Sequence, residues 1–288
     1  MITLSRMAWG CWAVVPVALV TYHYGPGQTA YVQDRAAQLQ NAAVHSQASA
    51  QTAQDGAYEK HLAAIEARRS AFLDPTAEHT AAATAATTAE QTMYATAASE
   101  WKVTAERYQE VLTTLGDASP QDASAVRWSK ARASVRAGDI WTGIDDLELL
   151  VDELEAEPAV DQPLARAARE ELATAYYYGA RLLRLSGMPA QEWRVESGKA
   201  RQHFRYLAEQ AKRGDSAESA ADAINDQRNL ELVLNLEQST LVDLQGKAMP
   251  KDSPCSGSSN RPAKKPGKKK PSGDARGAGV AAEIPDGW

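Results

Sequence analysis

The residue types that most often carry chemistry do not occur at the spacings that chemistry requires. The five histidines, at positions 23, 45, 61, 79 and 203, form neither the HExxH nor the HxxH pattern of a helical metal site. Gly198-Lys199 and Gly267-Lys268 lack the upstream glycine of a phosphate-binding loop, and the sequence contains no GxSxG. It therefore predicts no catalytic residue, no cofactor site and no metal site, while an enzyme whose site assembles from distant residues stays an alternative.

The remaining reactive side chains are two cysteines and a run of carboxylates. Cys11 and Cys255 lie at opposite ends of the chain without a CxxC spacing, which argues against redox chemistry and structural zinc. The carboxylates belong to an amphipathic helical pattern, so we expect them to form its hydrated acidic face. They are Asp145, Asp146, Glu148, Asp152, Glu153 and Glu155.

The composition favours an all-α protein. Hydrophobic residues make up 44% of the 288, and much of that is alanine, the best helix former, whereas strand-favouring β-branched residues are sparse through the first hundred positions. The net charge of −6 divides unevenly. Residues 247–288 hold nine Lys or Arg and four Asp or Glu, a net of +5, which leaves −11 for residues 1–246. An acidic body with a basic end argues against a compact nucleic-acid-binding domain.

An uncharged run near the start of the sequence predicts a membrane anchor over residues 1–27. At ~1.5 Å per helical residue, residues 7–24 nearly cross a hydrocarbon core of about 30 Å, and Trp and Tyr lie near both ends of the run. We expect an uncleaved transmembrane helix in contact with membrane lipid; a cleaved signal peptide and a lipoprotein modified at Cys11 are the alternatives. Arg6 predicts, by the positive-inside rule, a single-pass protein with its body on the periplasmic side.

Residues 28–116 show the spacing of two long helices. Gly25-Pro26-Gly27 is expected to break the anchor, after which small or apolar residues recur every three or four positions between residues 32 and 57. Asp74-Pro75 is expected to cap a second helix. The pair predicts an Ala-rich antiparallel hairpin, either a spacer or an oligomerising coiled coil. Before the turn, the apolar seam shifts to Tyr58, Leu62, Ile65, Arg69 and Phe72.

Residues 117–245 contain a stretch that resembles a tetratricopeptide repeat. Residues 125–154 hold two amphipathic helical patterns around a break at Ala137-Gly138-Asp139. The family places a large residue, a small pair, a turn and a later small residue at fixed positions. In this sequence Arg132 stands where the family has a small residue, and the first helix is one residue short. The matching positions are Trp128, Ala131-Arg132, Gly138-Asp139, Gly143, Leu147 and Leu150.

A second, looser copy of the pattern follows the first. Its turn at Gly187-Met188-Pro189 comes later than the family pattern allows, so its helices are expected to be longer, and a further helix over residues 217–244 is expected to cap the stack. The resemblance implies an α-solenoid of helix pairs whose concave face binds a peptide or protein; a generic helical bundle is the alternative. The copy consists of Leu172, Ala173, Tyr176, Ala200, Phe204 and Leu207.

Three successive tyrosines supply the candidate partner-binding residues. Tyr176, Tyr177 and Tyr178 point about 100° apart on a helix, so at least one is expected outside the core. A surface tyrosine can anchor a partner, and Tyr177, Tyr178 and Arg181 are therefore predicted to contact an unidentified protein. In the alternative, Tyr176 packs in the core and its neighbours cover the edges of the helix pair.

Residues 246–288 are rich in Pro, Gly, Ser and Lys and predict a disordered basic tail. Its lysine cluster could bind an anionic envelope polymer, lipid head groups or nucleic acid, or serve only as a solubilising extension. The cluster consists of Lys264, Lys265, Lys268, Lys269 and Lys270.

These patterns predict a membrane-anchored, non-enzymatic scaffold or adaptor of the bacterial cell envelope that recruits a protein partner through residues 117–245. A structural spacer whose basic tail contacts an anionic polymer is the alternative. A homo-oligomer formed through the hairpin is compatible with either.

Overall fold

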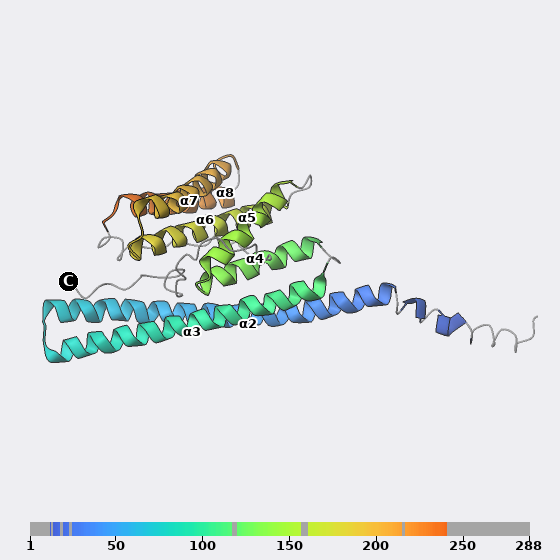
Figure 1. Cartoon of the computed structure of the whole chain (residues 1–288), viewed down its shortest axis with the longest axis horizontal. Helices are drawn as coiled ribbons and strands as arrows, with labels where there is room; N and C mark the ends of the chain where they lie inside the picture. Colours follow the sequence, from blue (N-terminus) through green and yellow to red (C-terminus); the bar gives the residue numbers. More distant parts are fainter. Residues whose placement is uncertain are drawn as a thin grey trace, which may run out of the picture.

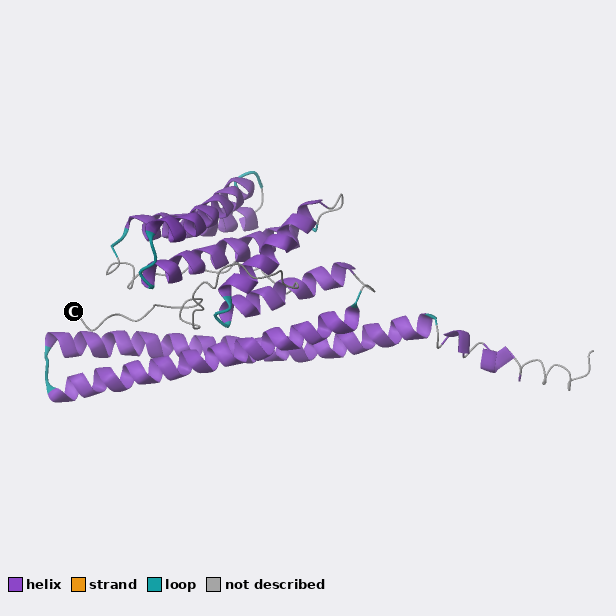
Figure 2. Cartoon of the chain, viewed as in Figure 1, coloured by secondary structure: helices purple, strands orange, loops and turns teal. Residues whose placement is uncertain are grey.

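The computed structural model describes residues 12, 14–17, 20–22, 25–116, 120–156, 161–214 and 217–240. Every regular element among these residues is a helix, so the prediction of an all-α protein is confirmed (Figure 2). The seven long helices are α2 (Pro26–Leu73), α3 (Ala77–Leu115), α4 (Pro120–Arg136), α5 (Ile140–Ala156), α6 (Gln162–Leu185), α7 (Ala190–Ala211) and α8 (Ala217–Gln238).

The prediction of a transmembrane helix is wrong for the part of the chain that the structure describes. None of the helices there combines the length and the apolar character that a membrane crossing needs. The long helices fall short because charged and amide side chains recur along them, and each would be costly in hydrocarbon. The single-pass membrane placement, with a body on the periplasmic side, rested on that helix and is corrected with it. The rest of the run 7–24, with its predicted lipid contact, lies outside the described residues.

The two longest helices, α2 with 48 residues and α3 with 39, form an antiparallel hairpin (Figure 1). Their ends differ from the predicted ones. Pro26 begins α2 instead of breaking the chain, because proline fits the first helical turn, where its missing N–H has no partner to lose. Thr76, not Asp74, caps α3: its side chain accepts a hydrogen bond of 3.1 Å from the backbone N–H of His79.

An alanine seam joins α2 to α3. The buried alanines of α2 recur every seventh residue, so one side of the helix stays in contact with α3 along its length. The predicted shift of the seam is wrong, because Tyr58, Leu62 and Ile65 are exposed while Ala57 and Ala64 beside them are buried. Small side chains let the helices approach closely, and the large side chains of the seam come from α3. The alanines are Ala36, Ala43, Ala50, Ala57 and Ala64.

Polar side chains bridge the hairpin at several levels along the seam. The Trp101 indole N–H donates to Gln54 at 3.1 Å, and the Tyr108 hydroxyl donates to Gln47 at 2.6 Å. Nearer the turn, Nδ1 of the buried His61 lies 2.7 Å from Oε1 of Glu90, which is also buried. A slip of one helix along the other would leave these buried polar groups unpaired, so they fix the register.

The remaining helices continue from the hairpin as a repeat-like series in which each helix packs on the next (Figure 1). α4 packs against α3, and α4 also contacts α6. Trp101 of α3 lies in one cluster with Ala50 of α2 and Ala133 of α4, which docks the series onto the hairpin. The main core of α4 to α8 is larger and includes Trp128, Leu147, Tyr176 and Phe204, each almost fully buried.

Glycines permit the tight turn and close crossing of α4 and α5. Gly138 has a φ of 92°, in the left-handed region that favours glycine, and lies in the turn between the two helices. At Gly143 a Cβ atom would press against the side chain of Val135 and lie 3.1 Å from the carbonyl oxygen of Ala131. The crossing of α4 and α5 at Gly143 therefore leaves no space for a larger residue.

We expect Gly143→Ala to destabilise the protein by about 1–3 kcal/mol, because an extra methyl group in a packed core forces the neighbouring side chain and backbone to move. The Val135 neighbour is β-branched and fully buried, so it cannot rotate away. The free energy of unfolding in urea measures the effect. Adding Val135→Ala should lessen the cost of Gly143→Ala in a double-mutant cycle.

Gly198→Ala in α7 is the matched control. Apart from the adjacent residues and nearby backbone of α7 itself, no atom lies within 4 Å of the Cβ that this substitution would add. Because alanine has the higher helix propensity, the variant should be as stable as the original or up to about 1 kcal/mol more stable. Equal effects of the two substitutions would contradict the close crossing at Gly143.

Candidate protein-binding surface on α5, α6 and α7

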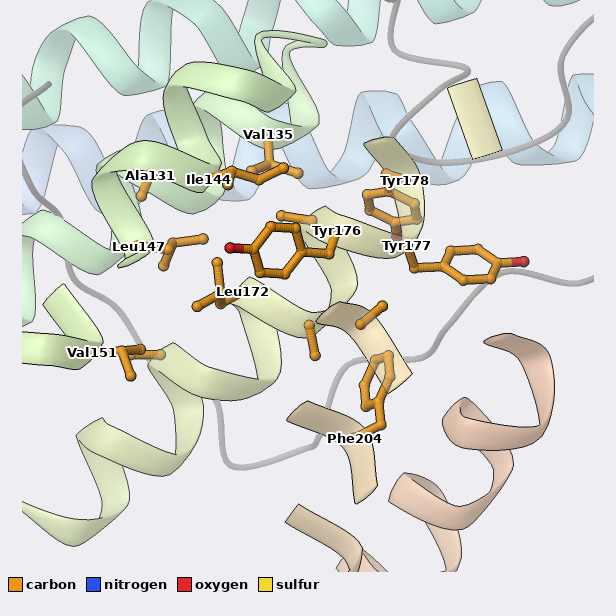
Figure 3. Packing of buried hydrophobic residues seen from close by; sticks show 14 of the residues in the cluster. Ala131, Val135, Ile144, Leu147, Val151, Leu172, Tyr176, Tyr177, Tyr178 and Phe204 are labelled. Atoms are coloured by element: carbon orange, nitrogen blue, oxygen red, sulfur yellow. The ribbon is translucent and has the colours of Figure 1, made fainter. Parts of the chain in front are cut away.

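The three residues predicted to bind a partner are buried. Tyr177 and Arg181 have no exposed surface, and Tyr178 has almost none. Figure 3 shows the tyrosines among apolar side chains from α4, α5 and α7. The expectation that at least one tyrosine lies outside the core is therefore wrong, and the structure does not support the exposed binding surface predicted for Tyr177, Tyr178 and Arg181.

The reason is the position of α6 in the series. A surface helix has an exposed side, but α6 packs against α5 and α7, contacts α4, and forms ion pairs with α8. Its tyrosines are consequently covered in all directions. Burial raises the pKa of the Tyr177 hydroxyl, while the charge of Arg181 and a hydrogen bond with it oppose that change. Arg181 therefore makes a polar contact with Tyr177 inside the core.

The acidic side of α5 is only partly the hydrated face that the sequence predicts. Asp145, Asp152 and Glu155 are exposed, but Asp146 is fully buried, and its Oδ2 lies 3.0 Å from Nζ of Lys130. This correction follows from the crossing with α4, which covers one flank of α5. The pairing joins residues on two helices, so the spacing within α5 could not reveal it.

A polar cluster links α5, α6 and α7. The hydroxyl of Tyr176 donates a hydrogen bond to Oε1 of Glu148. Nζ of Lys199 lies 3.0 Å from the same oxygen and 3.1 Å from the Tyr176 hydroxyl. Burial raises the pKa of Tyr176, and the Glu148 carboxylate raises it further. For Glu148, burial acts to raise the pKa, but the hydrogen bonds from Tyr176 and Lys199 outweigh it, so the pKa is lowered.

His203 extends this cluster toward α6. Its ring stacks on Tyr176 with centroids 5.7 Å apart, and its Nδ1 lies 3.2 Å from Nη1 of Arg169. Because an arginine can only donate, Nδ1 must accept and therefore carries no proton. Burial, followed by the charge of Arg169, lowers the pKa of His203 to about 4. The imidazole is consequently neutral near pH 7.

The outer end of the network is an exposed tyrosine on α7. The guanidinium of Arg169 lies 4.3 Å from the ring centroid of Tyr206 and also pairs with Glu155. Such cation–π contacts contribute about 0.5–1 kcal/mol at exposed sites. Tyr206 is 49% exposed, and Val195, about three turns earlier on α7, is 57% exposed. Arg169 therefore covers one side of the Tyr206 ring, while the rest of the side chain faces solvent.

We define the α7 surface as the outward residues around Tyr206. Its members combine apolar, aromatic and cationic side chains, whereas the neighbouring α5 exposes carboxylates. The arrangement suits recognition of another chain more than proton transfer, because the Glu148 carboxylate and the Tyr176 hydroxyl already satisfy each other. The α7 surface comprises Arg194, Val195, Lys199, Arg205 and Tyr206.

Sequence reasoning missed this surface, although a signal for it was present. Val195, Lys199 and Tyr206 recur at helical spacing on α7, outside the buried positions Ala200, Phe204 and Leu207. Among the described residues, no group of three or more His, Cys, Asp or Glu side chains is arranged to hold a metal ion. The predicted polyanion-binding residues Lys264, Lys265, Lys268, Lys269 and Lys270 lie outside the described residues.

We expect the stability of the protein to fall between pH 7 and pH 4.5 partly because of His203. A histidine with an ordinary pKa of 6.5 that is lowered to about 4 in the folded state binds its proton more readily when unfolded. The stabilisation is complete above pH 6.5 and is lost as the pH falls toward 4. His203→Gln keeps a hydrogen-bond acceptor for Arg169 but cannot titrate. Urea unfolding should therefore show a smaller loss of stability for this variant, and parallel pH profiles would contradict the assignment.

Comparison with known proteins does not assign this chain to a repeat family. No protein family, no curated protein and no solved structure matches this sequence. The architecture shows an all-α, repeat-like bundle of successively packed helices that is compatible with a helical repeat fold.

Proposed function

We propose that the protein is a non-enzymatic scaffold that binds a protein partner through the α7 surface of a tetratricopeptide-like helical region. The observation that carries the proposal is the exposed Tyr206 held by Arg169. Tyrosine and arginine are the residue types most enriched among the energetically dominant residues of protein interfaces. An anchor already fixed by the network loses less conformational entropy on binding.

The residues that suggested a tetratricopeptide repeat occupy positions that support this proposal. Trp128, Ala131 and Leu147 are buried in the core that α4 and α5 share with α6, and Gly143 makes the close contact expected of the small residue. Arg132, the departure from the family pattern, lies over the Trp128 ring at 5.4 Å, so its long side chain still covers the helix pair. Stacked helix pairs commonly bind extended segments of other proteins.

The charges around Tyr206 indicate which kind of partner fits. Arg194 and Arg205 are exposed on α7, and the half-exposed Lys199 lies between them along the helix with its ammonium paired to Glu148. A partner segment with carboxylates and one apolar side chain would pair with the arginines and cover Val195 and Tyr206. Rim charges of this kind mainly increase the association rate and are screened by salt.

A structural spacer remains the second candidate, favoured by the length of the hairpin. At ~1.5 Å per residue, the 48 residues of α2 extend over about 70 Å. A hairpin of this length would hold two molecules that bind at its opposite ends at a fixed distance from each other. In this function α4 to α8, which pack along the side of the hairpin, would not set the distance, and residues 241–288 would provide the attachment.

Crosslinking capture with the full chain, Tyr206→Ala and Arg205→Glu tests the proposal. Truncating an anchor residue typically costs 2 kcal/mol or more, which corresponds to about thirtyfold weaker binding. Both variants should therefore lose most of the specifically captured partner, and the loss for Arg205→Glu should be larger at low salt.

Tyr31→Ala is the matched control, since Tyr31 is an exposed tyrosine on α2, and it should leave capture unchanged. Thermal unfolding of each variant checks that α4 to α8 remain folded. Capture that survives both α7 substitutions but is lost when the chain ends at Thr240 would reject the α7 surface and support the spacer.

A further inference from the structure

The end of α2 nearest the hairpin turn exposes an apolar stripe. Tyr58, Leu62, Ile65, Phe72 and Leu73 are between 38% and 70% exposed. Phe72 is one of only two phenylalanines in the chain, and the other, Phe204, is fully buried. A contiguous group of large exposed apolar side chains commonly marks an interaction surface.

The spacing of the stripe fits a helical occupant. Tyr58, Leu62, Ile65, Arg69 and Phe72 follow the alternating four and three of a heptad, which keeps one side of a helix against another helix. The alanine seam that binds α3 lies on an adjacent side of α2, so the stripe remains open after the hairpin has formed. α4 packs on the hairpin near Ala43 and Ala50, away from this end.

The charges within the stripe are arranged for pairing with themselves. Oε2 of Glu66 lies 3.8 Å from Nη1 of Arg69, and both side chains are 69% exposed. A twofold axis perpendicular to α2, passing between Ala67 and Arg68, exchanges positions 66 and 69 between two antiparallel copies. Each copy would then place its Glu66 beside the other copy's Arg69, and its Leu62 beside the other copy's exposed Leu73.

We propose that the stripe is the contact between two copies of this chain, with their α2 helices antiparallel. Such a contact is isologous, because the same patch serves both copies. The contact buries the exposed apolar side chains. It also replaces the Glu66–Arg69 ion pair within each copy by two Glu66–Arg69 ion pairs between the copies. The two hairpins then form a four-helix arrangement at the ends where α2 meets α3 (Figure 1). This surface is separate from the α7 surface and does not depend on it.

Charge reversal tests the contact and its direction in the full chain. Glu66→Arg places two arginines together twice across the axis, and Arg69→Glu places two glutamates together twice. Each single variant should raise the dimer dissociation constant at least about tenfold in sedimentation equilibrium, because like charges face each other in the contact. The double variant Glu66→Arg/Arg69→Glu should restore the dimer, and a mixture of the two single variants should form a heterodimer.

Further variants separate this contact from other occupants. Phe72→Ala should weaken the dimer without unfolding the chain, because Phe72 is exposed, whereas Tyr31→Ala, near the other end of α2, should have no effect. A chain that is monomeric at all concentrations overturns the proposal, and so does a dimer that is insensitive to charge reversal. A dimer that forms only when the chain ends at Thr240 would show that its own later residues cover the stripe, which also overturns it.

Discussion

Small side chains at the helix crossings are the constraint on which the rest of the fold depends. The alanine seam of α2 brings that helix close to α3, and Gly143 brings α5 close to α4. Each alanine buries little apolar area and contributes little on its own. The short distance that it permits, however, lets Trp101 and Tyr108 reach across the seam to polar partners on α2. Trp101 also contacts Ala133, so α4 to α8 start from a surface that the close seam creates.

Ion pairs between helices complement a core that contains so much alanine. Glu171 lies between Arg132 and Arg136, and Arg166 pairs with Asp226 at 2.6 Å. The free energy lost when these charged groups leave water offsets most of the attraction between them, so the ion pairs contribute little net stability. A wrong helix pairing would leave one member buried alone, which costs several kcal/mol, on the order of 3–5. We infer that these pairs select which helices pack together, while the apolar contacts hold them in place.

The sequence predicts the periodic features of this chain well and the three-dimensional ones poorly. Alanine content and heptad spacing predict an all-α protein, and the helices on both sides of Gly138 are where the repeat pattern expects them. The burial of Tyr177 could not be predicted, because it depends on which helices surround α6. The sequence predicts a seam from Tyr58 to Phe72, because large apolar residues are usually buried, but in the structure the alanines are buried and these residues are exposed. Periodicity shows that a helix has an apolar side, but it does not identify the side that is already occupied.

The two proposed surfaces differ in what stabilises them, and this difference matters for how they would act together. Burial of apolar side chains contributes most to the contact at the α2 stripe, whereas the α7 surface carries arginines whose attraction salt screens. Pairing of two copies at the hairpin ends would present two α7 surfaces on one particle. A partner with repeated acidic segments could then bind both, and its second contact would form at a high effective concentration. A weak single contact at Tyr206 would in that case be sufficient, so exposure of only a few anchor residues on α7 is consistent with a scaffold that works as a pair.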